Sequence, residues 1–391
     1  MKFVFFAQYM PDPCGAFFHD IALAKELQRR GHGVHFVTTN RKNMPIRGVY
    51  RGLNWTFYSN AEAEMQGASI WMSPHYPFLQ LVRRLNENFR KPLVITMHFG
   101  ENTESVVQNT SGSWAEFLWI VSGHICEYVK AKVLISPLFK AVESVRPIML
   151  EHEIKFQERG TLPEGECITL VNANVLKGAA LFFELAKRFP TKKFLGVRPY
   201  YNIVKVPEIY PNIEWMDIQD DIRTVMRRTK ILLVPSKYES WGRVAFEAMY
   251  NGIPVVYSAP MDSLNSERRA SGSTEGMDEW IAGSQFKCDY FNIEEWEDAL
   301  NALDDPDTYK EYSDKAYDRT YSMEVFQDIP VVERKIVDYG VQFAPKEEVS
   351  SQKAAVGQGS LVSGMAPMFR MPAAGGGSGR PFQGGRFVVR R

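Results

Sequence analysis

The stretch VPSKYESWGRVAFEAMYNGIPVV, from Val234 to Val256, decides how this chain is interpreted. It begins as a buried strand, continues as a polar loop that carries Glu239, and becomes a helix that contains Glu247. The closing Gly-Ile-Pro then turns the chain into another apolar strand. Because a helix N-terminus offers unpaired N–H groups and a positive dipole end, it suits a diphosphate. The amides expected there are those of Ser240, Trp241, Gly242 and Arg243.

Strands and helices are expected to alternate on both sides of this stretch. Lys2–Ala7 and Val34–Thr38 are apolar strands joined by an amphipathic helix, and such a compact unit implies a parallel sheet. Further segments of the first half are strands at Ser69–Met72, Leu93–Met97 and Lys132–Ser136 and a helix at Trp114–Tyr128. In the second half the expected strands are Cys167–Asn172, Lys193–Val197, Ile213–Met216, Ile231–Pro235 and Pro254–Tyr257, and the helices are Gly178–Arg188, Asp221–Thr229, Arg243–Asn251 and Ile293–Leu303.

This order predicts an α/β protein of two facing Rossmann-like domains, with the ligand in the cleft between them, since open parallel sheets bind ligands at the carboxyl ends of their strands. The sequence turns polar around Phe156–Gly165, and we expect the boundary there. The expected parts are an N-terminal domain at 1–160, a C-terminal domain at 161–320, a helix at 321–343 that crosses back to the first domain, and a tail at 344–391.

Composition excludes several classes of protein. The formal net charge is +0, so the chain as a whole carries no signature of nucleic-acid or membrane binding. Its 4 cysteines are scattered without metal-type spacing, which is typical of a reduced, cytoplasmic protein. We expect no transmembrane segment, and the apolar N-terminus is better explained as a first buried strand than as a signal peptide.

The tail has a composition of its own. It is rich in Gly, Ala and Ser, carries seven basic residues against two acidic ones, and should be disordered. Arginines interspersed with Phe369, Phe382 and Phe387 make nucleic-acid binding conceivable, and with it a transferase that modifies nucleic-acid bases. We favour a solubilising or partner-binding tail, because such segments are common.

Two glutamates with seven residues between them, in a strand–loop–helix followed by Gly-x-Pro-Val, are the hallmark of the retaining glycosyltransferases of the GT-B fold known as family 4, the glycogen-synthase-like group. Glu239 and Glu247 resemble that pair. The resemblance covers approximately residues 1–340 and implies a nucleotide-diphosphate sugar as donor substrate, with no separate cofactor. It implies that Glu239 contacts the sugar hydroxyls and that Glu247 binds the ribose. Two charged residues on a solvated helix face are the plainer explanation of the spacing alone.

Other residues match the family's motifs in part. Lys177 precedes Gly178 as the diphosphate-binding lysine does, but the arginine expected five residues earlier is Asn172. Arg198 or Arg243 could replace that arginine. Gly15 keeps one glycine of the pair that approaches the donor phosphates.

Two strand-end residues complete the match. His98 occupies the position of a histidine that faces the donor sugar, although a locally bonded histidine explains it nearly as well. Ser136 is interpreted as structural.

The resemblance implies transfer with retention, in which the departing diphosphate helps to deprotonate an unknown acceptor on the same face of the sugar. The catalytic group would be Glu239, Lys177 and His98, and the donor-binding group Glu247, Gly15, Asn172 and the amides of Ser240–Arg243. We predict metal independence and interpret Asp220 and Asp221 as helix-capping residues. The alternatives are a non-catalytic nucleotide-sugar-binding scaffold, motivated by Asn172 and the single glycine, or an epimerase or phosphorylase of the same architecture.

Overall fold

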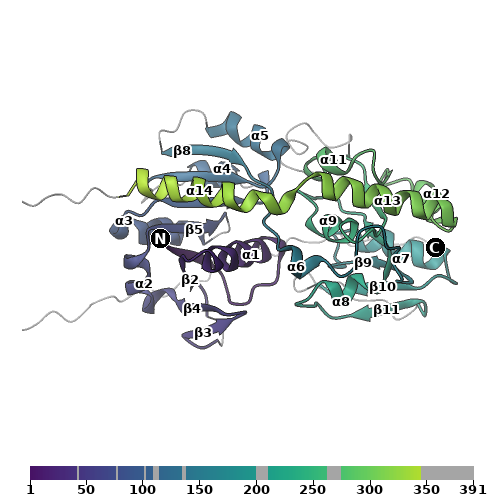
Figure 1. The fold of residues 1–391 in the computed structure, drawn as a ribbon, viewed down its shortest axis with the longest axis horizontal. Helices are drawn as coiled ribbons and strands as arrows, with labels where there is room; N and C mark the ends of the chain where they lie inside the picture. The colour runs from purple at the N-terminus through teal and green to yellow at the C-terminus, as the bar shows by residue number, and fades with distance from the viewer. Residues whose placement is uncertain are drawn as a thin grey trace, which may run out of the picture. The chain divides into compact units, whose positions relative to one another are not determined.

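A computed structural model describes residues 1–41, 44–75, 78–100, 103–108, 114–133, 138–199, 210–261 and 274–344. These residues form two sheets with helices on both faces of each (Figure 1). We call residues 1–145 together with the last helix, α14 (Asp328–Gln342), the first lobe, and residues 167–322 the second lobe. The tail predicted from residue 344 lies almost entirely outside the described residues.

The first lobe is built on an 8-stranded sheet with the order β3-β4-β2-β1-β5-β6-β7-β8. All neighbouring strands are parallel except β3 and β4, which form an antiparallel hairpin at one edge. The strands are β1 (Lys2–Ala7), β2 (Gly33–Thr38), β3 (Arg47–Tyr50), β4 (Leu53–Phe57), β5 (Ile70–Pro74), β6 (Leu93–Met97), β7 (Glu116–Ile120) and β8 (Phe139–Ser144).

Strand β1 explains why the first sheet needs helices on both faces. Its side chains alternate between two hydrophobic clusters, with Phe3 and Phe5 in one and Val4 and Phe6 in the other. All four are buried, so the strand reads as one continuous apolar run. The helices of the first half are α1 (Gly15–Arg29), α2 (Glu62–Gly67), α3 (Leu79–Phe89), α4 (Thr103–Gln108), α5 (Gly123–Val133) and α6 (Glu151–Ile154), with a 3-10 turn η1 (Tyr58–Asn60).

The second lobe is built on a 6-stranded, fully parallel sheet with the order β11-β10-β9-β12-β13-β14. Its strands are β9 (Cys167–Leu170), β10 (Phe194–Val197), β11 (Ile213–Met216), β12 (Thr229–Val234), β13 (Val255–Ser258) and β14 (Phe286–Cys288). Its helices are α7 (Ala179–Arg188), α8 (Arg223–Met226), α9 (Arg243–Met249), α11 (Glu275–Ile281), α12 (Ile293–Ala302) and α13 (Pro306–Ser322), followed by a 3-10 turn η3 (Val325–Gln327).

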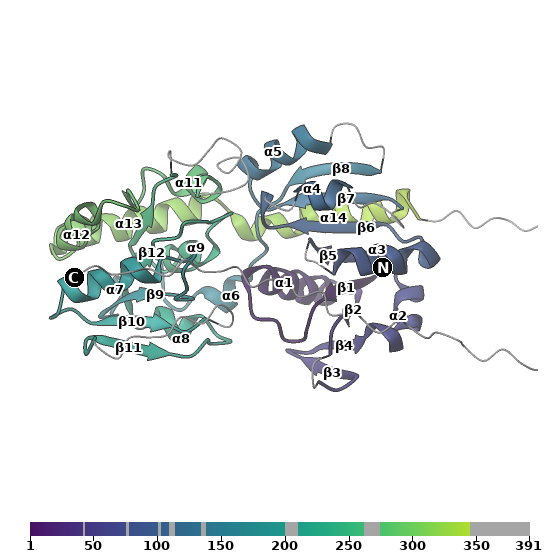
Figure 2. The same ribbon diagram turned by 180° about the vertical axis from the view of Figure 1, so that it is seen from behind.

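Helix α14 returns the chain to the first lobe. Figures 1 and 2 show it leaving the end of α13 and lying along the first sheet. Ile329, Val332 and Ile336 are buried in the same cluster as Phe3 and Phe5 of β1. The core of the first lobe is therefore completed by the last described helix.

Three sequence predictions are wrong. Trp114–Tyr128 is not a helix but contains β7 and the start of α5, because a strand covered on both faces is as continuously apolar as a buried helix. The strand predicted at Lys132–Ser136 begins inside α5; the strand is β8, and Ser136 lies outside the described residues. The helix predicted at Asp221–Thr229 shrinks to α8, because Thr229 already pairs with Cys167 in the sheet.

Candidate active site

A cavity of about 830 Å³ lies between the two lobes. Residues that follow the carboxyl ends of β1, β6, β9, β11 and β12 line it, together with the last residue of β10, as expected for parallel α/β sheets. Every site residue predicted from the sequence is among the lining residues: Gly15, His98, Asn172, Lys177, Glu239, Ser240, Trp241, Gly242, Arg243 and Glu247.

Lys177 and Glu239 form an ion pair in this cavity. The Lys177 Nζ donates to the Glu239 carboxylate and lies 3.5 Å from the Tyr238 carbonyl oxygen. Ser236 Oγ donates a second hydrogen bond to Glu239 over 3.1 Å. The Glu239 side chain is only 10% exposed, and Lys177 compensates its charge. Because Lys177 also lines the cavity, the same ammonium group can contact a ligand.

The loops that carry this pair are bonded to each other. The Lys237 amide donates to the Leu176 carbonyl over 2.9 Å, and the Asn174 side chain accepts from the Lys177 amide over 3.0 Å. Gly178 follows with a φ of +79°, and a Cβ there would lie 2.0 Å from the Pro235 carbonyl oxygen. Glycine at this position therefore lets the two loops approach closely enough for the lysine to reach the glutamate.

Arg243 and Glu247 form a second pair one turn apart on α9. The Arg243 Nε donates to Glu247 Oε1 over 2.7 Å. Burial raises the pKa of Glu247, Arg243 opposes that rise, and nearby Glu153 adds to it. Within the described residues, Nη1 of Arg243 is buried and has no hydrogen-bond partner, so this guanidinium can still bind an anion.

Asn172, Arg198 and Arg243, the three positions considered for a second diphosphate-binding cation, differ in their surroundings. Asn172 has a left-handed backbone with a φ of +61° and accepts from the Asn174 side chain over 3.1 Å. Arg198 pairs with Asp217 over 3.0 Å and does not line the cavity, whereas Arg243 does. Of the two arginines, only Arg243 therefore faces the cavity.

Two helix N-termini open onto the cavity. Helix α1 has 15 residues and begins at Gly15, where a Cβ would meet nothing within 4 Å. Helix α9 has only 7 residues, and its first helical bonds are donated by Ala245 and Phe246 to the Gly242 carbonyl. Gly242 itself has a φ of +74° and packs against Met277, which fixes the turn that precedes α9.

His98 belongs to a cluster of buried histidines. Its ring lies edge-on to His19, with centroids 5.5 Å apart, and its amide nitrogen lies 3.1 Å from His75 Nδ1. Burial holds the pKa of His98 well below its usual range, and His19, His75 and Arg243 lower it further. His98 is therefore neutral at pH 7, which suits hydrogen bonding to a hydroxyl rather than neutralisation of a phosphate.

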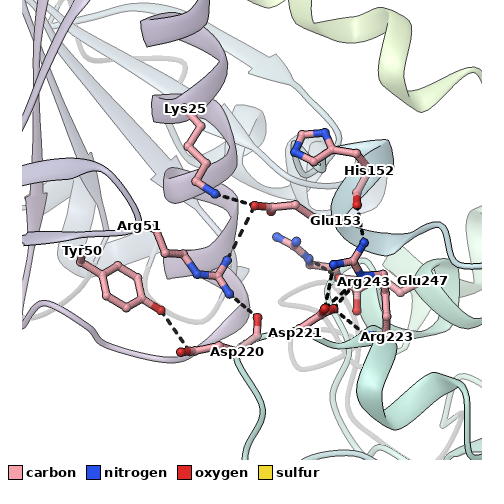
Figure 3. A network of polar contacts seen from close by, with 10 residues as sticks. All are labelled: Lys25, Tyr50, Arg51, His152, Glu153, Asp220, Asp221, Arg223, Arg243 and Glu247. Atoms are coloured by element: carbon pink, nitrogen blue, oxygen red, sulfur yellow. Dashed lines mark hydrogen bonds and ion pairs between the residues drawn. The ribbon is translucent and has the colours of Figure 1, made fainter.

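Sequence reasoning missed a polar network on the other side of the cavity (Figure 3). Lys25 Nζ of α1 donates to Glu153 Oε1 over 2.6 Å, and Arg51 Nη1 lies 3.8 Å from the same oxygen. Tyr50 OH donates to Asp220 Oδ1 over 3.1 Å, and Arg51 Nη2 donates to the Asp220 carbonyl. The only sequence signal was the Arg51-Gly52 pair between two segments of strand-forming residues.

Asp221, predicted as a helix-capping residue, directly precedes Ile222, the N-cap residue of α8. Its Oδ1 accepts from the Arg223 amide over 3.0 Å, at the start of α8. Asp220 instead faces the first lobe through Tyr50 and Arg51. In the part of the chain that the structure describes, no group of three or more His, Cys, Asp or Glu residues could hold a metal ion. Each helix described is too short or too polar to cross a lipid bilayer.

Comparisons with known proteins agree with this geometry. Residues 208–319 match the family of glycosyl transferases group 1, and this segment contains both Glu239 and Glu247. A search of curated proteins finds no significant match.

Solved structures resemble the chain over most of its length. The sucrose-phosphate synthase tll1590 of Thermosynechococcus elongatus has a TM-score of 0.63 at 12% identity, over 86% of this chain and 99% of that chain. Anabaena Alr3699/HepE in complex with UDP-glucose has a TM-score of 0.62 at 14% identity, over 86% of this chain and 100% of that chain. Likenesses at such low identity show the fold, and the predicted GT-B arrangement of two Rossmann-like halves is thereby confirmed.

Proposed function

We propose that this chain, whose residues 208–319 match the family of glycosyl transferases group 1, is a glycosyltransferase that moves a sugar from a nucleoside-diphosphate sugar to an acceptor with retention of anomeric configuration. One observation carries the proposal: the Lys177–Glu239 pair and the Arg243–Glu247 pair face one cavity at the carboxyl ends of the second sheet. UDP-glucose bound by the structurally similar HepE supports a donor of this class.

The donor diphosphate fits the end of the cavity where Lys177 and Arg243 lie. Lys177 exchanges its contact with Glu239 for the leaving phosphate, and Nη1 of Arg243 supplies the second positive charge that Asn172 does not. The first turn of α1 at Gly15 adds backbone N–H donors from the first lobe. Once released from Lys177, the Glu239 carboxylate accepts hydrogen bonds from sugar hydroxyls.

Transfer then needs only positioning and charge stabilisation. The bond between the sugar's anomeric carbon and the phosphate oxygen breaks, and a bond from that carbon to the acceptor oxygen forms on the same face. The acceptor proton passes to the departing phosphate oxygen, so that all atoms and charges balance. Neutral His98 holds a sugar hydroxyl near the anomeric carbon, and Glu247 holds the ribose of the nucleotide.

The decisive experiment measures nucleoside diphosphate released from a panel of UDP-, GDP- and ADP-sugars. Glu239→Ala and Lys177→Ala are expected to lower release about 100-fold or more, the order of loss seen when one preorganised transition-state contact is removed. Lys187→Ala is the matched control, because Lys187 is an exposed lysine of α7 outside the cavity. If wild-type protein and the three variants release nucleoside diphosphate at equal rates, the proposal is wrong.

A non-catalytic scaffold is the second candidate, favoured by Asn172 where an arginine is expected and by the mutual neutralisation of Lys177 and Glu239. It predicts nucleotide-dependent thermal stabilisation without release from any donor, even when candidate acceptors are added. Activity on nucleic-acid bases is the alternative acceptor class. It requires that deletion of residues 344–391 weaken nucleic-acid binding.

A further inference from the structure

We propose that Arg51, at the tip of the β3–β4 hairpin, contacts the nucleoside part of the donor and is a specificity-determining residue for it. The inference rests on the proposed function, because it assumes that the cavity binds a nucleotide. It adds a contact from the first lobe, which the match to residues 208–319 does not include. Arg51 lines the cavity together with the loop that connects β11 to α8.

The wall beside Arg51 has the composition of a base-binding surface. Ile218 and Ile222 line it and provide apolar area against which a flat ring can pack, and the buried Val197 and Val225 lie behind them. Arg51 borders this wall, since its Nη2 donates to the carbonyl of Asp220 in the loop that carries Ile218 and Ile222 (Figure 3). A nucleoside held against that wall would lie within reach of the guanidinium.

Arg51 is held in place without using up its donors. Its guanidinium carbon lies 5.6 Å from the centre of the Phe18 ring and 5.7 Å from that of Tyr50. Nη1 lies 3.8 Å from Glu153, which is an ion-pair distance rather than a hydrogen bond. Of the five N–H groups of an arginine, the contacts within the described residues engage one with the Asp220 carbonyl and one with the neighbouring Tyr50 hydroxyl. The others remain for acceptor atoms of a base or ribose.

The backbone conformation at Arg51 also supports this inference. Arg51 has a φ of +48° and Gly52 a φ of +80°, as in the two-residue hairpin turns that favour asparagine or glycine at both positions. An arginine at the first position costs conformational energy that asparagine would avoid. Strain of this kind is typical of positions whose side chain serves a ligand, because the turn by itself has no need of a guanidinium.

Arg51 contacts the nucleoside rather than the diphosphate, because different charged side chains lie at the two ends of the cavity. Lys177 and the unpartnered Nη1 of Arg243 serve the phosphate end. Arg51 instead belongs to the network of Glu153, whose charge is felt by Glu247. Glu247 is the residue proposed to bind the ribose, so Arg51 lies at the ribose and base.

Arg51→Asn tests the inference, because it removes the guanidinium and relieves the turn. The measurements are melting temperature and the Kd of three probes: the tightest-binding of UDP, GDP and ADP, its monophosphate, and inorganic pyrophosphate. We expect an equal or higher melting temperature and a Kd about tenfold higher for the di- and monophosphate, as for the loss of one good hydrogen bond. The Kd of pyrophosphate should stay the same. A residue that only stabilised the fold would lower the melting temperature instead.

Three further variants make the result decisive. Arg47→Gln, at an exposed position of β3, is the matched control and should bind like wild type. Tyr50→Phe removes the hydroxyl that bonds to Asp220 but keeps Arg51; if it loses as much affinity as Arg51→Asn, the tip merely ties the lobes together and the inference is wrong. Arg51→Met keeps the strained turn and the long side chain without its donors, so it should also bind about tenfold more weakly.

The experiment distinguishes failure of the proposed function from failure of the inference about Arg51. If wild-type protein binds none of the three nucleoside diphosphates, the proposed function falls and the inference falls with it. If wild-type protein binds and both Arg51 variants bind equally well, only the inference falls. A loss confined to probes that contain a diphosphate would reassign Arg51 to the phosphates and overturn the nucleoside contact.

Discussion

The Nε of Arg243 donates a hydrogen bond to the Glu247 carboxylate over 2.7 Å, one turn further along α9. Their side chains are 16% and 8% exposed, so each supplies most of the compensation for the other's charge. The pair also orients the guanidinium so that its buried Nη1, which has no partner within the described residues, remains for a ligand. One helix turn thus combines an ion pair with a guanidinium nitrogen that is left without a partner among the described residues.

Breaking this pair from one side should destabilise the protein. Arg243→Met leaves Glu247 buried without its partner, and we expect the free energy of unfolding to fall by about 2 kcal/mol, less than for a fully buried pair because Arg243 is partly exposed. Urea denaturation measures the loss. The double variant Arg243→Met/Glu247→Gln should recover much of it, and strictly additive losses in the double-mutant cycle would show that the two side chains are not coupled.

Gly178 should tolerate a methyl group far less well than another glycine of the same backbone conformation. In Gly178→Ala the new Cβ would meet the Pro235 carbonyl oxygen at 2.0 Å, whereas in Gly160→Ala, at a φ of +85°, it would meet nothing within 4 Å. Both variants lose about 1 kcal/mol from the left-handed backbone, and Gly178→Ala should lose about 1–3 kcal/mol more from the clash. Only Gly178→Ala should also slow donor cleavage, because it displaces Lys177. Equal behaviour of the two variants would contradict the close approach of these loops.

The buried histidines should make the protein less stable in acid. Burial lowers the pKa of His19 to about 3 and that of His75 to about 4, and it lowers the pKa of His98 as well. Below their ordinary pKa of about 6.5 these histidines take up protons in the unfolded chain but not in the folded one. The free energy of unfolding that they support is therefore fully present above that pH, and it is lost as the pH falls towards the folded pKa values. Each histidine contributes at most about 1.4 kcal/mol per pH unit in that window. Raised pKa values at Asp20 and Glu247 act in the opposite direction.

His19→Asn isolates one of these contributions. The asparagine oxygen can replace His19 Nδ1 as acceptor of the Ile148 amide, a bond of 2.8 Å. The variant should therefore lose less stability than wild type between pH 6 and pH 4.5, by up to about 2 kcal/mol. The measurement is urea denaturation at both pH values. An unchanged pH dependence would mean that His19 takes up its proton in the folded state as well.

Turnover should not depend on a divalent metal ion, because the predicted phosphate contacts are Lys177, Arg243 and backbone amides. EDTA at a concentration that strips Mg²⁺ and Mn²⁺ should leave the rate of donor cleavage unchanged within about twofold. Restoration of a lost rate by added Mg²⁺ would contradict this expectation and require carboxylate ligands for the metal.

The sequence predicted those elements whose pattern is local. Strands β9 and β12 and helices α7 and α9 lie where they were expected, because each combines a short apolar run with a glycine or proline close to one of its ends. The residues predicted to face the cleft do line one cavity, since they follow the carboxyl ends of parallel strands.

What the sequence did not predict depends on contacts between distant segments. Glu116, in the segment predicted as a helix, lies in a strand and forms a fully buried ion pair with Arg83, 33 positions earlier. Arg51 and Glu153 come together from a hairpin tip and a short helix that share no pattern with the rest of the site. Whether Arg198 or Arg243 faces the cavity was likewise decided by packing and not by position in the chain.

Helix α14 has a consequence for how the protein is made. Because Ile329, Val332 and Ile336 complete the core of the first lobe, that lobe cannot finish folding when its own strands leave the ribosome. Gly340 lies so close to Met1 and Ile70 that a Cβ would come within 2.7 Å of both side chains, which ties β1 and β5 to residues synthesised after the whole second lobe. The hydrophobic cluster of the first lobe therefore stays incomplete until the second lobe has been translated.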